Sequence, residues 1–238
     1  MYPHALLMMA VLPAAAIDRP STLPAGTVQL DVGFGVHDAR VLGVDLPAEA
    51  SFPLGVTWGA GERLQLGVST TLDVAPDARW PGDASFGLAW RAWAHDDVDL
   101  TPTFTLPITT RAGYDVVSVA TIGAGLRWRA SRRVELHALR GLWRVDIRPY
   151  VALSAVADGG VLVQVAPCVA VDVSTELARW TLVGQYAVDT TFIDGLPVAV
   201  GVLWALRPRF DLRAAARVDD VAAPGDGFGL SVGLSSRW

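Results

Sequence analysis

The amino-acid sequence predicts an all-β protein, a closed antiparallel up-and-down transmembrane β-barrel of about 12 strands. Three observations lead to this prediction. Apolar and polar residues alternate with a period of two along most of the chain, the polar face carries small side chains, and aromatic residues stand at the ends of the alternating segments. With 52% apolar and 18% charged residues, the chain is far from the composition of a disordered protein.

The first segment of the chain predicts a secretory leader. Residues 5–16 (ALLMMAVLPAAA) are apolar and end in three alanines, which suit a signal-peptidase site. We therefore expect a signal peptide over 1–16, a short lead-in over 17–26 and the barrel over 27–238. After the leader, no apolar stretch reaches the roughly 18 residues that a membrane helix requires.

Alternation marks the expected strands, beginning with Val28, Leu30 and Val32 on one face against Gln29 and Asp31 on the other. We expect twelve strands, and 132–146 is uncertain, so ten or fourteen are also possible. The expected strands are 27–36, 51–58, 63–74, 84–93, 98–108, 117–129, 147–155, 161–172, 179–188, 197–206, 210–218 and 228–238.

The chemistry of the two faces separates a membrane barrel from a soluble sandwich. The polar face is mostly Gly, Ser, Thr and Gln, whereas a water-facing sheet normally carries many Lys and Glu. The sequence contains no Lys, so all 19 basic residues are Arg. The other face is consistently bulky, which indicates strands that are apolar outside and polar inside.

Aromatic residues of the apolar face stand beside short connections, expected at 59–62, 130–133, 174–177 and 206–209. Such clustering is typical of a girdle at the membrane–water interface, although aromatic residues of a soluble β core are the alternative. Longer connections, such as 37–50 and 219–227, alternate with the short ones and are rich in Asp. The expected girdle consists of Trp58, Trp90, Trp128, Trp180, Trp204, Phe210 and Trp238.

Residues 228–238 (FGLSVGLSSRW) alternate up to an aromatic C-terminus. This segment resembles the C-terminal strand of Gram-negative outer-membrane β-barrel proteins, although Trp238 replaces the commoner Phe and Ser236 stands at an apolar position. The resemblance implies a bacterial outer-membrane location, insertion by the barrel-assembly machinery and contact with outer-membrane lipid and lipopolysaccharide. It names no subfamily.

Charged residues on the polar parity are the candidate lumen lining. They could set the selectivity of a water-filled passage, or pair across the lumen and stiffen the wall. Twelve strands fall between filled eight-stranded barrels and open sixteen-stranded ones, and the small lining residues favour a narrow pore. The candidates are Asp31, Asp73, Arg91, Asp99, Arg127, Asp172, Asp211, Arg213, Arg217 and Arg237.

The sequence thus predicts a small passive channel for ions or small polar solutes. A structural or adhesive barrel, whose acidic loops bind a partner, divalent ions or lipopolysaccharide, is the alternative, and a lipid-modifying enzyme is a third. His37, His95 and His137 stand apart from any hydrolase or metal-ligand motif, so we expect no enzymatic activity, metal or cofactor. A net charge of −5 gives no basic footprint for nucleic acid, and the single Cys168 cannot form an internal disulfide. The oligomeric state is not predicted.

Overall fold

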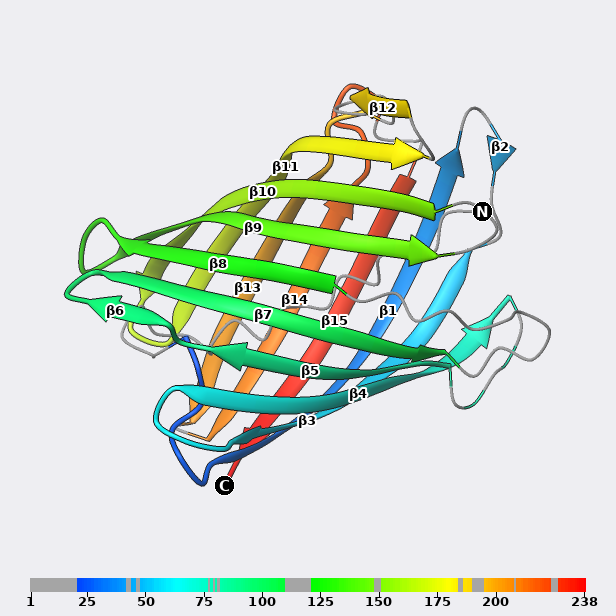
Figure 1. Ribbon diagram of the computed structural model, residues 1–238. Coiled ribbons are helices and arrows are strands. Elements are labelled where there is room, and N and C mark those ends of the chain that lie inside the picture. The colour runs from blue at the N-terminus through cyan, green and yellow to red at the C-terminus, as the bar shows by residue number, and fades with distance from the viewer. Residues whose placement is uncertain are drawn as a thin grey trace.

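In the computed structural model, the described residues form fifteen strands in one antiparallel sheet that closes on itself (Figure 1). It describes residues 21–41, 44–45, 48–76, 78, 80, 82–109, 121–147, 151–183, 186–189, 195–207, 209–223 and 227–238. The expected signal peptide and residues 17–20 of the lead-in lie outside these residues, as do 110–120 and the loop residues Asp77, Asp194 and Asp226. The described residues include no helix long and apolar enough to cross a membrane.

Twelve long strands form the closed wall, as predicted. In chain order they are β1 (Val28–Val41), β3 (Glu49–Gly59), β4 (Leu64–Ala75), β5 (Asp83–Trp90), β7 (Val98–Thr109), β8 (Thr121–Arg129), β9 (Val134–Ile147), β10 (Val151–Ala166), β11 (Val169–Val183), β13 (Val198–Arg207), β14 (Phe210–Val218) and β15 (Gly227–Arg237). Three short strands extend the sheet beyond this wall: β2 (Val44–Asp45), β6 (Trp93–His95) and β12 (Tyr186–Asp189).

Each strand of the wall pairs with its sequence neighbour, and β1 pairs with β15 to close the ring. The seam continues to the chain end, where Val28 and Trp238 exchange both backbone hydrogen bonds at 2.9 Å. Closure leaves no unpaired edge along the wall, which is the only way a sheet satisfies its backbone groups inside a bilayer. The start of β1 and the end of β15 therefore lie at the same end of the barrel.

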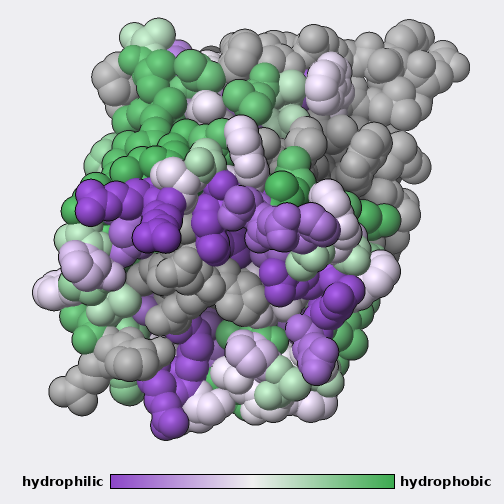
Figure 2. Space-filling model, turned by 90° about the vertical axis from the view of Figure 1, so that its left-hand side faces the viewer, coloured by the Kyte–Doolittle hydropathy of each residue, from purple (hydrophilic) through white to green (hydrophobic). Residues whose placement is uncertain are grey.

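The two ends of the barrel differ in their connections. The end that holds the start of β1 carries the short connections 60–63, 130–133, 167–168 and 208–209, and we call it the short-turn end. In Figure 1 it lies to the left, where β6, β7, β8 and β9 turn. Hydrophilic residues gather across the middle of this end, which faces the viewer in Figure 2. The opposite end carries the longer connections, with the exception of 148–150.

The middle third of the chain departs from the expected strand bounds, although the total is right. The uncertain stretch 132–146 belongs to the long strand β9, the expected strand 161–172 is interrupted by the turn at Pro167 and Cys168, and the expected turn 174–177 lies inside β11. Register shifts in β9–β10 and β10–β11 explain the error, because each inserted residue moves the following side chains to the other face. The bulge in β11 falls at Leu177.

Outward-facing positions on the wall are apolar and exposed. Val32, Val68, Val202 and Leu230 all project from strand interiors with more than a third of their surface open. Side chains buried in the described part of the barrel include few apolar ones, and Leu162, Ala170 and Leu203 stand on the inward parity. The exterior is thus the larger apolar surface of the molecule, which suits a lipid environment.

An arginine on the outward face tests whether lipid covers the wall. Val68, 59% exposed in mid-strand β4, faces outward, and its neighbour Ser69 faces inward. We expect Val68→Arg to lower the free energy of unfolding by about 2–4 kcal/mol in lipid vesicles, as an arginine at the bilayer midplane does. Urea titration of the folded barrel in vesicles measures this loss.

Ser69→Arg is the matched control. It should cost less, on the order of 1 kcal/mol, because it loses only the 2.7 Å hydrogen bond to Ser85 and points into the lumen. Equal losses in the two variants would contradict the assignment of the faces.

Candidate functional site

The candidate functional site is the lumen of the barrel. The structure places all ten sequence-predicted lining residues on the inward parity of their strands, opposite the exposed apolar positions. Six of them take part in two polar networks at the short-turn end. Asp172 of β11 contacts His137, and Arg213 is buried on β14. Asp73, which accepts a hydrogen bond from Thr71 at 2.9 Å, and Arg217 stand toward the long-loop end.

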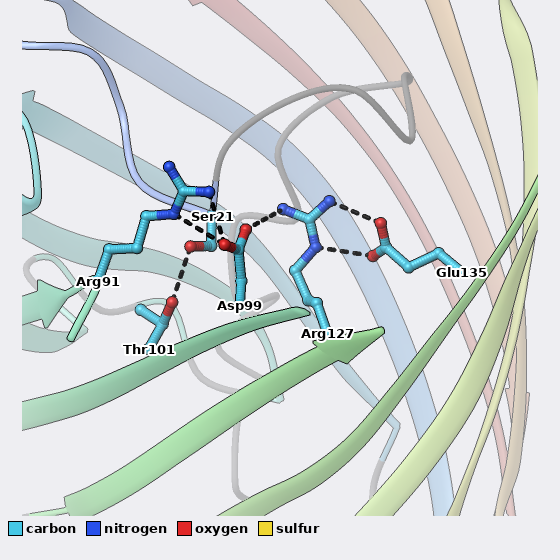
Figure 3. A network of polar contacts seen from close by, with 6 residues as sticks. All are labelled: Ser21, Arg91, Asp99, Thr101, Arg127 and Glu135. Atoms are coloured by element: carbon cyan, nitrogen blue, oxygen red, sulfur yellow. Dashed lines mark hydrogen bonds and ion pairs between the residues drawn. The ribbon is translucent and has the colours of Figure 1, made fainter. Parts of the chain in front are cut away.

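The first network joins four charged side chains from the region of β5 to β9 (Figure 3). Arg91, just after β5, donates to the Asp99 carboxylate of β7 from Nε at 2.9 Å and from Nη2 at 2.5 Å. Arg127 of β8 donates two parallel hydrogen bonds, of 2.8 and 2.6 Å, to the carboxylate of Glu135 of β9. The Nη1 atom of Arg127 also lies 3.8 Å from Asp99, so the four groups form one chain.

Strand register explains this arrangement. Asp99 is the direct partner of Arg127 across β7 and β8, and Glu135 lies one inward position from His137, which is the partner of Arg127 across β8 and β9. The side chains of such neighbours are close enough for ion pairs. Glu135 is only 2% exposed, so the two hydrogen bonds from Arg127 take the place of water at its carboxylate. Two arginines and two carboxylates leave the network electrically neutral.

The second network closes the seam between β14, β15 and β1. Arg237 donates from Nη2 to Asp211 and from Nε to Gln29 Oε1, the latter at 2.6 Å. The amide nitrogen of Gln29 then donates to both carboxylate oxygens of Asp31 at 2.9 and 3.0 Å, and Ser235 donates to the same carboxylate. Gln29 and Asp211 are fully buried, which makes this the most enclosed polar cluster of the described wall.

A buried histidine links β9 to β11. His137 Nε2 lies 2.6 Å from Asp172 Oδ1, although β10 runs between the two strands. The imidazole reaches across because its partner on β10 is Gly160, where a Cβ atom would overlap the ring. Gly160 therefore allows the imidazole of His137 to lie against the backbone in mid-strand. The sequence Asp158-Gly159-Gly160, expected to lie between strands, is part of β10.

The ion pairs of the two networks and of His137 share one geometry. In these contacts the partners stand on adjacent or next-adjacent strands, so the ion pairs run along the wall rather than across the lumen. Pairs of this kind stiffen the wall and keep the charged side chains away from the axis of the barrel.

Small side chains line the middle of the lumen. In the strand register they face one another on neighbouring strands as Gly33 with Gly233, Gly55 with Ser69, Gly67 with Gly87, Ser69 with Ser85, and Gly201 with Ala215. A Cβ atom added at Gly87 or Gly201 would meet its nearest neighbour at 3.9 or 3.7 Å, which is ordinary contact. Packing therefore does not demand glycine at these two positions, and the missing side chains leave space in the lumen. We call this zone the waist.

A third polar cluster stands at the long-loop end. His37 of β1 lies 3.0 Å from Asp219, which follows β14, and Arg217 Nε donates to the same carboxylate at 2.9 Å. Burial alone would raise the pKa of Asp219, but the hydrogen bond to His37 and the charge of Arg217 outweigh it, so the pKa lies below its ordinary value. Asp219 is thus held as a carboxylate at the rim.

Sequence reasoning missed several members of these clusters. Gln29 and Ser235 stood on the expected polar parity and could have been included. Glu135 and His137 lie in the uncertain stretch 132–146, so their inward direction was not predicted. The signal that would have found them is the alternation of Val134, Glu135, Leu136 and His137.

All seven residues of the expected girdle are outward-facing and exposed. Trp58, Trp90 and Trp128 stand at the short-turn ends of β3, β5 and β8, and Trp204, Phe210 and Trp238 lie toward the same end. Trp180 does not, because the expected turn beside it is part of β11, and it pairs with Ala155 and Asp189 in the other half of the barrel.

Solved structures of outer-membrane proteins share this architecture. The NanC porin matches with a TM-score of 0.63 at 11% identity, over 87% of this chain and 98% of that one. An outer-membrane channel from Pseudomonas putida F1 matches at 0.59 and 12% identity, over 91% and 97%. The KdgM porin in complex with disordered oligogalacturonate matches at 0.60 and 8% identity, over 87% and 98%. The chain has the fold of outer-membrane β-barrel channels.

Sequence comparison adds no narrower assignment. No protein-family model matches the chain, and no curated protein matches it in sequence. At these low identities the structural likeness establishes the fold alone.

Removing one arginine tests the first network. We expect Arg127→Met to lower the free energy of unfolding by about 3–5 kcal/mol, because it leaves the buried Glu135 charge without its bidentate partner. The double variant Arg127→Met/Glu135→Leu should recover most of this loss, since neither charge remains. Urea unfolding of the two variants in lipid vesicles makes the comparison, and identical midpoints would contradict the pairing.

The rim cluster predicts a pH dependence with a defined sign. Because the folded-state pKa of Asp219 lies below its ordinary value of 3.8, the ionised carboxylate stabilises the cluster at neutral pH. This stabilisation is fully present above the ordinary value and is lost as the pH falls through the lower folded-state pKa. Amide protection at residue 219, whose N–H donates to Gly227, should stay constant from pH 7 to about 5 and fall only in stronger acid.

Asp219→Asn is the control for the pH experiment. It should show weaker protection already at neutral pH and no further acid transition, because the titrating group is gone. A transition of the same size in this variant would assign the pH dependence to other groups.

Proposed function

We propose that the protein is a passive channel of the bacterial outer membrane, through which ions or small polar solutes diffuse. The waist carries this proposal: glycine and serine face inward on neighbouring strands in mid-barrel, and nearby charges are held against the wall by their partners. Such a lining offers hydrogen-bonding groups to a passing solute and few bulky side chains to obstruct it.

The exterior supports the proposed location. Exposed valines, leucines and tryptophans cover the outward positions of the wall, and six of the seven girdle residues lie toward the short-turn end. We infer that outer-membrane lipid and lipopolysaccharide surround the barrel, that the girdle lies at headgroup level and that the short-turn end faces the periplasm. Export by a signal peptide and insertion through the barrel-assembly machinery belong to the same proposal.

A bulky residue at the waist tests the channel directly. Purified protein in planar bilayers should show discrete conductance steps, and Gly87→Phe should reduce their size on the order of twofold, because the new ring enters the passage. Gly87 has room for this change, since the nearest atom to an added Cβ is the Gly67 carbonyl oxygen at 3.9 Å.

Leu88→Phe is the matched control, because Leu88 is the next residue of β5 and its side chain points outward. It should leave the conductance unchanged. Folded wild-type barrels that conduct no ions would reject the channel, and equal effects of the two variants would reject the waist as part of the passage.

A further inference from the structure

The chain segment before β1 turns back into the barrel. Residues 21–26, which we call the inner strap, precede the wall at the short-turn end. Gly26, with a φ of 77°, donates to the Gly59 carbonyl at 2.8 Å, and Thr27 donates to the Pro24 carbonyl at 3.0 Å, which reverses the chain direction. Pro24, Ala25 and Gly26 are exposed at this turn, whereas Thr22 and Leu23 are buried.

The strap contacts the inward face of strands that lie well away from β1. The backbone N–H of Leu23 donates to Gln65 Oε1 of β4 at 3.0 Å, and Thr101 of β7 donates to the Ser21 hydroxyl at 2.8 Å. Figure 3 shows Ser21 beside Asp99 and Arg91 of the first network. The strap therefore runs over the inner wall from β3 toward β7, within the mouth of the lumen.

The strap packs directly against the backbone of Gly59, which we call its seat. It is the last residue of β3, and a Cβ atom there would overlap the Pro24 carbonyl oxygen and lie 2.9 Å from that of Leu23. Because these are backbone atoms of the strap, a rotamer change cannot relieve the clash. Any side chain at this position must push the strap out of the mouth.

The wall does not depend on the strap. The twelve long strands satisfy their ladders with one another, and the strap adds two side-chain hydrogen bonds together with the turn at Gly26. Among the described residues the buried Thr22 hydroxyl has no hydrogen-bond partner, which makes this position of the strap less favourable than a fully hydrogen-bonded one. A segment held in this way can leave the lumen while the barrel stays folded.

We propose that the inner strap is a built-in constriction of the channel, and that its seating on Gly59 limits the passage of solute at the short-turn end. This inference rests on the proposed channel function. The strap narrows the mouth on the side of β3 to β7, so its release widens the route that leads to the waist.

Substitution of the seat tests the proposal. Gly59→Val should expel the strap and raise the single-channel conductance in planar bilayers by at least twofold over wild type. Gly61→Val is the matched control, because Gly61 lies in the adjoining turn and an added Cβ there meets nothing within 4 Å. It should conduct like wild type. Gly59→Val channels of wild-type conductance, with the strap shown to be released, would overturn the proposal.

Cysteine labelling reports on the strap independently of conductance. In a Cys168→Ser background, which removes the exposed native thiol, Ser21→Cys should react with a water-soluble maleimide roughly tenfold faster when Gly59→Val is added and at the same rate when Gly61→Val is added. Unchanged labelling in the Gly59→Val protein would overturn the role of Gly59 as the seat. Faster labelling with no conductance in wild type or in any folded variant would instead overturn the channel, and the strap's role with it.

Discussion

Closure of the sheet is the constraint on which the rest of this structure depends. Every long strand finds two neighbours, including β1 with β15 across the seam, so the wall offers no open edge. In a bilayer this is obligatory, because lipid tails cannot hydrogen-bond an exposed backbone. Closure also fixes the direction of every side chain: successive residues must point alternately to lipid and to the lumen. Each strand must therefore carry apolar residues for the lipid and polar residues for the lumen at alternate positions.

The lumen follows from that division. Inward side chains on adjacent strands stand close together, so charges placed there find partners along the wall, as Arg127 does with Glu135 and Arg237 with Asp211. The pairs of Arg127 and Arg237 lie toward the short-turn end, the His37–Asp219 pair stands at the long-loop end, and small residues take the middle. The ion pairs and the small lining residues are thus separated along the barrel axis.

The fold class could be predicted from the sequence because its signal repeats. A single alternating segment is ambiguous, but many in succession, with small polar residues on one face, are difficult to fit into a soluble sheet. The prediction went wrong where the period breaks. Leu177 is an inserted residue that shifts the parity of β11, and the connection at Pro167 and Cys168 is too short to interrupt a run of valines. Bulges and two-residue turns arise from tertiary pairing, which the pattern of one strand does not contain.

For the candidate site, the sequence predicted which residues face the lumen but not which of them contact one another. Alternation placed Asp99, Arg127 and Asp211 in the lumen, but the partner of each depends on the register between strands, and a shift of one residue would exchange lumen for lipid. The contact of His137 with Asp172 shows this limit most clearly, because it needs Gly160 on the strand between them. The inner strap shows it again: residues 21–26 carry no alternation, and only the meeting of Gly59 with Pro24 shows that they enter the barrel. The features that would control passage are therefore the ones that come from pairing and close approach, and these become visible only once the ring is closed.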